Sequence, residues 1–280
     1  MQLISTKKEL KSYLDSHKKT KSIGLVPTMG ALHMGHISLV KKSAEENELT
    51  VVSIFVNPTQ FNNKEDLDKY PSTLEADLGL LQAVSNDIVV FAPSASEIYS
   101  GEITSKTYDF EGLENVMEGE FRKGHFDGVG TIVEKLLRII SPTRAYFGEK
   151  DFQQLQIIKK LVDNTNLPVE IIGCPIVREA NGLAMSSRNE RLDTELRQEA
   201  GFIYKTLKAA KQKFGTKSAN FVVDWVKKQF NAHPKLNLEY VKIADADQLK
   251  PVIRKNRKVK YRAFIAVYAG DVRLIDNIAL

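Results

Sequence analysis

Two histidines, His33 and His36, stand three residues apart in the stretch Val26–Val40, which reads VPTMGALHMGHISLV. Imidazoles can donate hydrogen bonds to phosphate oxygens, transfer protons or bind a metal. In a helix this spacing puts both rings on one face, and a place in the first turn sets them beside backbone N–H groups that attract anions. The pattern therefore predicts a phosphate-binding site.

Two other interpretations fit the same spacing. A zinc site is not favoured, because the chain has one cysteine and no H-E-x-x-H pattern. A pair of packed structural histidines stays open beside the phosphate site. The glycines match neither G-x-G-x-x-G nor the G-K-[ST] of a P-loop, so no standard nucleotide signature decides between the two.

The elements that position the histidines follow from apolar spacing and from turn residues. The apolar run to Val26 predicts a strand that Pro27 ends, Gly30 supplies a turn, and helical spacing begins at about Leu32. The predicted strands are Ser22–Val26, Thr50–Val56, Asp87–Phe91, Arg144–Phe147 and Val169–Gly173. A capping box at Thr6–Glu9 predicts one helix before the first strand. Further helices are predicted at Gly35–Asn47, Thr73–Ser85, Val129–Ile140 and Phe152–Asn164. This βαβα order implies an α/β fold with a parallel sheet covered on both faces.

In open parallel sheets, ligands bind beyond the carboxyl ends of the strands. Polar segments follow the predicted strands at that edge: Thr28-Met29, Asn57–Gln60, Gly148–Asp151 and Cys174-Pro175. The polar stretch Asn57–Pro71 is consistent with a flap over a substrate. These segments converge on one edge, which favours a binding site there.

After Val177 the pattern changes to helices and then to strands that short turns connect, which indicates a separate α+β domain. We therefore expect residues 1–177 to form the sheet domain and residues 178–280 a smaller one, with the site in the cleft between them. The predicted elements are helices at Leu192–Phe214 and Ser218–Asn231 and strands near Leu238–Ala244, Tyr261–Tyr268 and Val272–Ile275.

Charge and cysteine content narrow the class of protein. The 280 residues carry a formal net charge of +5, and residues 181–280 hold 20 Lys and Arg against 10 Asp and Glu. The basic run Lys250–Arg262 fits a solvated hairpin better than a nucleic-acid patch, and a polyanionic small substrate would suit it equally. One cysteine, a polar start and no apolar run near about 18 residues predict a cytoplasmic protein without a disulfide or a membrane span.

Four segments in order carry a family resemblance: PTMGALHMGH, FVNPTQF, YFGEKDFQQL and GLAMSSRN. The first resembles the "HIGH" signature of the nucleotidylyltransferase superfamily, which includes class I aminoacyl-tRNA synthetases. Together, over nearly the whole chain, they resemble the pantothenate synthetase family, which joins pantoate to β-alanine using ATP. The resemblance implies a Rossmann-like doubly wound sheet, a pantoyl-adenylate intermediate with AMP and pyrophosphate as products, Mg²⁺ accompanying ATP, and a homodimer.

The resemblance also assigns an ATP site. His33 and His36 would face the phosphates, with His36 as proton donor, and Lys150 would place a point charge on phosphate. Met185–Arg188 is similar to the "KMSKS" loop of the synthetases and would meet the leaving pyrophosphate. The implied ATP contacts are Met29, Gly30, Ala31, Leu32, His33, Met34, Gly35, His36, Gly148, Glu149, Lys150, Asp151, Val177, Met185, Ser186, Ser187 and Arg188.

Three amide side chains match the family's substrate pocket. Gln60 and Gln154 would hold pantoate, because an amide offers both a donor and an acceptor to a substrate with two hydroxyls. Gln60 would also meet β-alanine. Asn57 belongs to the same pocket.

Four more residues lie at family positions without a firm role. Asp77 aligns with an acidic residue near the metal in the family. Mg²⁺ is coordinated mainly by substrate phosphates and water, so no protein ligand is assigned. Arg122 and His125 are second-tier candidates before a predicted helix. Ser72 departs from the arginine that relatives commonly carry, which leaves the docking of the flap open.

The resulting prediction is a pantoate–β-alanine ligase whose basic second domain acts as a lid over the triphosphate. The alternatives are a nucleotidylyltransferase that releases a free nucleotide and, in another class, a non-enzymatic RNA-binding protein. Pyrophosphate exchange that depends on pantoate distinguishes the ligase from both.

Overall fold

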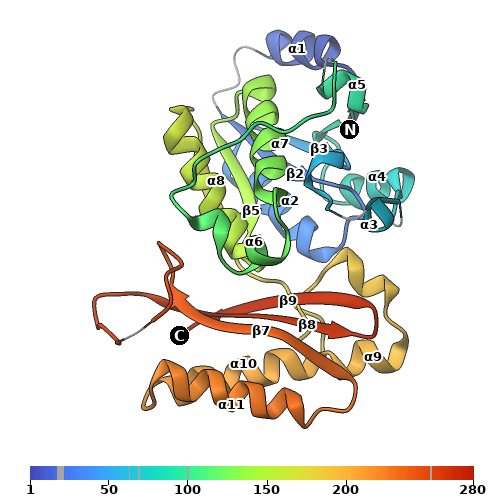
Figure 1. Cartoon of the computed structure of the whole chain (residues 1–280). Coiled ribbons are helices and arrows are strands. Elements are labelled where there is room, and N and C mark those ends of the chain that lie inside the picture. The colour runs from blue at the N-terminus through green and yellow to red at the C-terminus, as the bar shows by residue number, and fades with distance from the viewer. Residues whose placement is uncertain (18–21, 63, 69, 100, 253) are drawn as a thin grey trace. The chain divides into compact units, whose positions relative to one another are not determined.

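A computed structural model describes residues 1–17, 22–62, 64–68, 70–99, 101–252 and 254–280. The chain divides into two compact units: residues 1–149 with 154–175, and residues 150–153 with 176–280. Each unit is described by itself. The predicted fold class is confirmed, because the first unit holds a parallel sheet flanked by helices and the second a small antiparallel sheet (Figure 1).

The sheet of the first unit has six parallel strands in the order β1-β4-β3-β2-β5-β6. The order reverses between β2 and β5, as in a doubly wound Rossmann-like sheet, and ligands bind at such a reversal. The three-residue strand β1 was not predicted, because it is too short to show a pattern. The strands are β1 (Gln2–Ile4), β2 (Ile23–Thr28), β3 (Leu49–Ile54), β4 (Val89–Phe91), β5 (Arg144–Gly148) and β6 (Glu170–Cys174).

Helices cover both faces of this sheet. Val26, Val52 and Val90 point from neighbouring strands into one core with Val40 of α2 and Leu81 of α4. On the opposite face, α8 lies so close to β6 that a Cβ at Gly173 would be 2.9 Å from the side chain of Leu155. The helices are α1 (Lys7–Ser16), α2 (Met34–Glu46), α3 (Lys64–Asp68), α4 (Leu74–Gln82), α5 (Ala95–Ile98), α6 (Glu118–Phe121), α7 (His125–Ile140) and α8 (Phe152–Thr165), with 3-10 turns η1 (Pro58–Gln60), η2 (Leu113–Asn115) and η3 (Glu149–Asp151).

The start of α1 is the predicted capping box. Thr6 Oγ1 accepts the N–H of Glu9 (3.2 Å), and the N–H of Thr6 donates to the Glu9 carboxylate (3.3 Å).

None of the helices in the described ranges has the length and apolar character needed to cross a lipid bilayer.

The prediction that Pro27 ends its strand is wrong, because β2 continues through Pro27 to Thr28. Pro27 pairs in register with Ser53 of β3, whereas the pairing of β2 with β5 covers only Gly24 and Leu25. At Pro27 the strand therefore has one paired neighbour, so the missing N–H costs no second ladder bond. It also follows that β2 and β5 separate before their carboxyl ends, at the point where the strand order reverses.

The helix α7 begins at His125, four residues before the predicted start. Lys106 and Tyr108, which precede η2 in the chain, are held by Glu134 of α7. The Glu134 carboxylate accepts Lys106 Nζ (2.9 Å), Tyr108 Oη (2.7 Å) and Arg138 Nε (2.8 Å). Burial raises the pKa of Glu134, but these three donors together outweigh it and lower the pKa to about 2.

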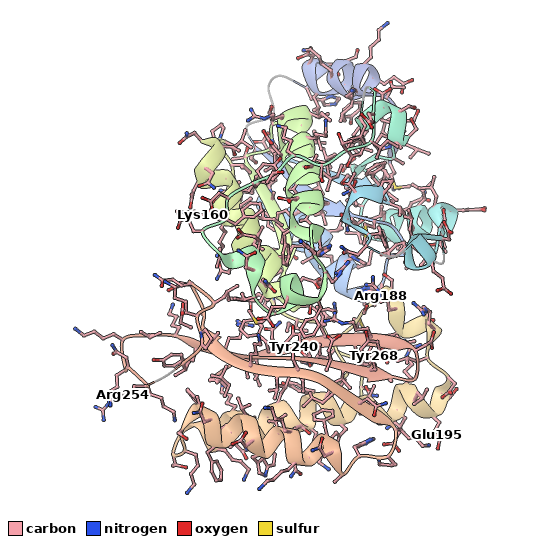
Figure 2. The ribbon with its side chains drawn as sticks, viewed as in Figure 1. Lys160, Arg188, Glu195, Tyr240, Arg254 and Tyr268 are labelled. Carbon is pink, nitrogen blue, oxygen red and sulfur yellow. The ribbon has the colours of Figure 1, made fainter. Side chains whose placement is uncertain are left out.

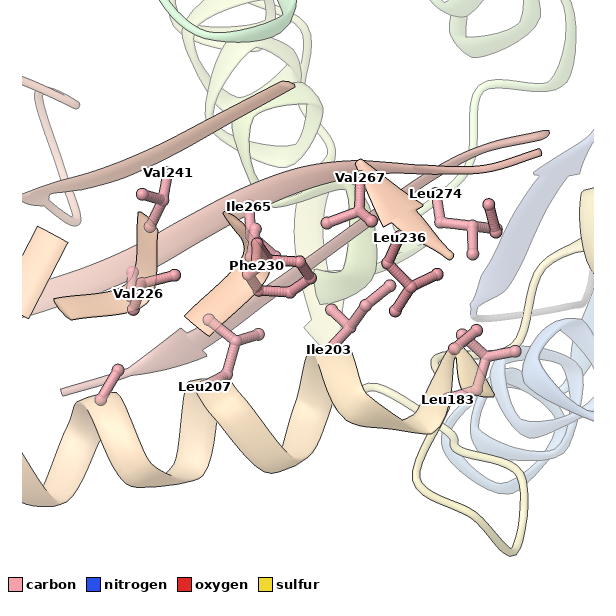
Figure 3. Packing of buried hydrophobic residues seen from close by; sticks show 14 of the residues in the cluster. Leu183, Ile203, Leu207, Val226, Phe230, Leu236, Val241, Ile265, Val267 and Leu274 are labelled. Carbon is pink, nitrogen blue, oxygen red and sulfur yellow. The ribbon is translucent and has the colours of Figure 1, made fainter. Parts of the chain in front are cut away.

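The second unit places two helices against one face of an antiparallel sheet. These two helices are α10 (Gly201–Phe214) and α11 (Ala219–Asn231). Figure 3 shows Ile203 and Leu207 of α10 pointing toward the strand residues Ile265 and Val267, which are fully buried. The strands, in the order β7-β8-β9, are β7 (Leu236–Asp245), β8 (Tyr261–Ala269) and β9 (Val272–Ala279), and the helices are α9 (Thr194–Glu199), α10 (Gly201–Phe214) and α11 (Ala219–Asn231), preceded by the 3-10 turn η4 (Ser187–Arg191).

The single helix predicted at Leu192–Phe214 is wrong, because the structure divides it into α9 and α10. Asn181 explains the break: its Nδ2 donates to the carbonyl of Arg197 in the last turn of α9 (2.8 Å). Its own carbonyl lies 2.7 Å from where a Cβ would be at Gly201, the first residue of α10. Only glycine admits this approach of the Asn181 backbone.

We expect Gly24→Ala to lower the free energy of unfolding by about 1–3 kcal/mol, the usual cost of overpacking. The added Cβ would lie 2.1 Å from Ser43 Oγ and 2.6 Å from Asn47 Nδ2, both buried under β2. Gly79→Ala on α4, where a Cβ meets nothing within 4 Å, is the matched control and should be slightly stabilising. Thermal unfolding measures both variants, and equal melting temperatures would contradict the packing argument.

We expect Glu134→Gln to lower the free energy of unfolding at pH 7 by on the order of 1–3 kcal/mol. Because the folded pKa of about 2 lies below the ordinary value of 4.5, the contribution of the carboxylate is complete above the unfolded pKa and is lost as pH falls toward 2. Urea unfolding should therefore show a smaller difference between variant and parent near pH 3. Exposed Glu102, changed to Gln, is the control, and a pH-independent difference at Glu134 would refute its depressed pKa.

Candidate active site

The turn between β2 and α2 is held by a buried carboxylate from another helix. Asp77 of α4 is 1% exposed, and its two oxygens accept the N–H groups of Ala31 (3.0 Å) and Leu32 (2.7 Å). Gly30 and Ala31 both have positive φ, +83° and +50°, so the chain turns sharply here. Thr73 Oγ1 also donates to Asp77 Oδ1 (3.2 Å), which fixes the carboxylate.

The two histidines cap the helix for each other. His33 is the N-cap residue of α2: its Nδ1 accepts the N–H of Gly35 (3.1 Å), and its own N–H donates to His36 Nδ1 (3.3 Å). The ring centroids lie 4.1 Å apart. Because both Nδ1 atoms accept, each neutral ring carries its proton on Nε2. The rings are thus structural through Nδ1 and are N–H donors through Nε2.

Gln60 lies beside Met29 in the first unit. Its Nε2 donates to Met29 Sδ (2.9 Å), and its Oε1 accepts Asn57 Nδ2 (3.1 Å). Asn57 is 1% exposed, donates also to the carbonyl of Gly128 (3.1 Å) and accepts the hydroxyl of Tyr99. These contacts hold the Gln60 side chain in place, with Asn57 linking it to α7 and to Tyr99.

Arg122 and His125 hold the backbone of the same residue. His125 Nδ1 donates to the carbonyl of Gln60 (2.8 Å), so its Nε2 accepts Arg122 Nη1 (3.1 Å). Arg122 Nη2 reaches the same carbonyl at 3.4 Å. The two second-tier candidates therefore lie next to a predicted substrate residue, at the start of α7.

Tyr99 and Gly128 were not singled out from the sequence. Tyr99 lies in a stretch without a pattern, so nothing could have marked it. Gly128 had one usable signal, since a glycine in the first turn of an apolar helix is costly unless something approaches it. A Cβ there would lie 2.3 Å from the carbonyl oxygen of Thr59, next to Gln60.

The predicted segment Gly148–Asp151 begins at the end of β5. Gly148 pairs with Cys174 of β6, and Glu149–Asp151 form η3, where Lys150 Nζ lies 3.3 Å from Asp151 Oδ1. Gln154 follows in the first turn of α8. Gly148, Glu149 and Gln154 belong to the first unit by their contacts, whereas Lys150 and Asp151 belong to the second.

The remaining predicted ATP contacts form a hairpin and a capped turn in the second unit. The N–H of Met185 donates to the carbonyl of Val177 (3.0 Å). The backbones of Arg178 and Ala184 form an antiparallel β-bridge. Ser186 then caps η4, which holds Ser187 and Arg188, by accepting the N–H of Arg188 on its Oγ (3.3 Å). Arg188 is labelled in Figure 2.

Protein side chains in the described ranges form no group of three His, Cys, Asp or Glu that could hold a metal ion. Asp77, which aligns with an acidic residue near the metal in the family, uses both oxygens to accept backbone N–H groups. The carboxylate of Asp77 is thus already engaged by the turn between β2 and α2.

Comparison with known proteins identifies the family. The model of the pantoate–β-alanine ligase family matches residues 2–279. The chain belongs to this family. It is 59% identical over 260 residues to the pantothenate synthetase of Christiangramia forsetii, covering 93% of this chain and 92% of that protein. It is 56% identical over 273 residues to that of Flavobacterium psychrophilum, covering 97% of each.

Solved structures of the ligase family have the same fold. A pantothenate synthetase from Thermus thermophilus matches with a TM-score of 0.92 at 38% identity over 99% of both chains. A pantoate–β-alanine ligase from Francisella tularensis, complexed with β,γ-ATP and β-alanine, matches with a TM-score of 0.80 at 37% identity over 100% of this chain and 97% of that one.

We expect Asp77→Asn to destabilise the ligase fold by about 1–3 kcal/mol, because the new NH₂ group would face a backbone N–H of Ala31 or Leu32 and leave it unpaired. Urea unfolding measures the change. Asp163→Asn, on an exposed position of α8, makes the same chemical change as a control. If the two variants unfolded at the same urea concentration, the carboxylate would not be holding the turn.

Proposed function

We propose that this chain joins pantoate to β-alanine using ATP, giving pantothenate, AMP and pyrophosphate. The pantoate carboxylate attacks the α-phosphorus of ATP and displaces pyrophosphate, which leaves a pantoyl adenylate. The β-alanine amine then attacks the acyl carbon, and AMP leaves. Membership of the ligase family over residues 2–279 supports this reaction.

The reciprocal histidine cap is the observation that carries the chemical proposal. It fixes two Nε2–H donors, from His33 and His36, at the start of α2. The helix N-terminus there also favours negative charge. As pyrophosphate departs, charge grows on the bridging and terminal oxygens, and donors already oriented toward that charge stabilise it without reorganising.

The other site residues divide by chemistry. We propose that Gln60 and Gln154 hold pantoate, with Asn57, Arg122 and His125 positioning Gln60 through the contacts described above. Further ATP contacts are assigned to the Met29–Gly35 loop, Gly148–Asp151, Val177 and Met185–Arg188. Among these, Lys150 and Arg188 supply positive charge to phosphate oxygens.

Mg²⁺, oligomeric state and location complete the proposal. Mg²⁺ would arrive with ATP and neutralise part of the triphosphate charge. A homodimer and a cytoplasmic location are proposed with the family, as is a division at Val177 into a nucleotide-binding domain and a lid domain. Sedimentation at micromolar concentration would test the dimer, and a clean species of 31.5 kDa would refute it.

Two substitutions of His36 separate its donor from its structural role. In His36→Asn, the amide oxygen can take the place of Nδ1 and keep the cap, but no donor remains at Nε2. This variant should lose about 10²–10³ in the rate of pantoate-dependent exchange of radiolabelled pyrophosphate into ATP, with a melting temperature near that of the parent. In His36→Gln, the amide nitrogen reaches the Nε2 position, so more rate should remain while the cap weakens.

The wild-type chain is the first control. Exchange that requires pantoate but not β-alanine is the expected result, and its absence would refute the adenylate. Equal rates for His36→Asn and the parent would show that the histidine serves only the cap. Tight, salt-sensitive RNA binding without exchange would favour the non-enzymatic alternative.

A further inference from the structure

Two consecutive polar residues are buried near the end of a strand of the second unit. Asp276 and Asn277 of β9 are 4% and 2% exposed, in a strand whose Val272 and Leu274 belong to the hydrophobic core. Side chains alternate along a strand, so Asp276 lies on the face of these core residues and Asn277 on the opposite face. Each of the two therefore meets a different part of the second unit.

Asp276 holds the base of the hairpin that leads to Met185–Arg188. Arg178 donates to both of its oxygens, Nη1 to Oδ2 (2.6 Å) and Nη2 to Oδ1 (2.9 Å). Arg178 Nη1 also donates to the carbonyl of Gly182 in the same hairpin (3.1 Å), and its guanidinium lies 3.6 Å above the ring of Tyr204. Burial raises the pKa of Asp276, and the hydrogen bonds from Arg178 oppose the rise.

Asn277 holds the turn that carries Lys150. Its Nδ2 donates to the carbonyl of Lys150 (2.9 Å), and its Oδ1 accepts Arg262 Nη1. The Arg262 guanidinium lies 3.9 Å from the ring centre of Phe152, which also contacts Phe264, the register partner of Asn277. Because a carbonyl can only accept and a guanidinium can only donate, these two contacts fix the orientation of the amide.

Stability alone does not explain why Asp276 and its ion-pair partner Arg178 are buried here. A buried ion pair is roughly neutral for stability against well-packed apolar residues of the same volume, whereas losing one partner leaves an uncompensated charge. What Asp276 and Asn277 supply is position: their Cα atoms are about 3.8 Å apart in a paired strand, so the two segments they hold are fixed relative to one another.

We propose that Asp276 and Asn277 are positioning residues for the phosphate chemistry, which fix the Met185–Arg188 loop and the Lys150 turn on one strand. The inference rests on the proposed function, in which both segments meet ATP phosphates. Displacing a catalytic group by about 1 Å can cost about 10²-fold in rate. The two side chains thus act through Arg188 and Lys150 without touching the substrate.

The first experiment replaces each anchor with a near-isosteric residue. Asn277→Asp turns the donor facing the Lys150 carbonyl into an acceptor, and Asp276→Asn removes the charge that Arg178 pairs with. Each should lower kcat for pantoate-dependent pyrophosphate exchange about 10- to 100-fold and leave the KM for pantoate within about twofold. The control is Val226→Ala, in the core of the same unit on α11, which should lower the melting temperature but not kcat at low temperature.

The second experiment asks whether each anchor acts through its segment. When Lys150→Ala is already present, Asn277→Asp should lower kcat for pyrophosphate exchange little further. When Arg188→Ala is already present, Asp276→Asn should likewise lower kcat little further. Losses that multiply in full would overturn the proposal, as would full activity of Lys150→Ala or of either anchor variant.

A third measurement does not need activity. Amide hydrogen exchange should rise in peptides covering residues 149–153 for Asn277→Asp and residues 177–188 for Asp276→Asn, with peptides of α10 unchanged. A uniform rise across the unit, or none, would overturn the positioning role. Wild-type protein that lacks pyrophosphate exchange but shows this local pattern would instead reject the proposed function and keep the anchoring contacts.

Discussion

The candidate site depends on the carboxylate of Asp77, which gathers the N–H groups of Ala31 and Leu32 from a turn 45 positions or more away in sequence. A non-glycine residue with φ of +50°, such as Ala31, is costly unless its surroundings over-determine it. Asp77 provides that constraint from a helix that follows a different strand. The direction in which α2 starts, and with it the place of both histidines, is therefore set by packing between elements rather than by the local sequence.

The histidine pair shows why a structural and a chemical interpretation of one motif need not compete. Each imidazole has two nitrogens, and in His33 and His36 the backbone uses Nδ1 of both. The hydrogen bond that caps the helix also decides which nitrogen carries the proton. An aspartate at the cap would stabilise the helix equally well, but its carboxylate only accepts hydrogen bonds and would present no donor.

Sequence periodicity predicted the sheet because burial on both faces leaves continuous apolar runs, as in Val89–Phe91. It failed where the deciding partner lies elsewhere in the chain. Pro27 stays within a strand because β5 has already separated from β2, and the helix predicted through Ala200 breaks because Asn181 takes the carbonyl of Arg197. Motif resemblance supplied the candidate site residues, whereas the scaffold of Tyr99 and Gly128 had no motif to reveal it.

Chain continuity and packing also disagree at the turn after β5. Residues 150–153 follow a strand of the first unit directly, yet their contacts assign them to the second. The reason is chemical: Phe152 finds the Arg262 guanidinium and Phe264, and the Lys150 carbonyl finds Asn277, 127 positions further along the chain. A boundary drawn from the order of strands and helices cannot detect such a contact. The division therefore follows side-chain and carbonyl partners rather than secondary structure, since it separates Phe152 and Gln153 from the rest of α8.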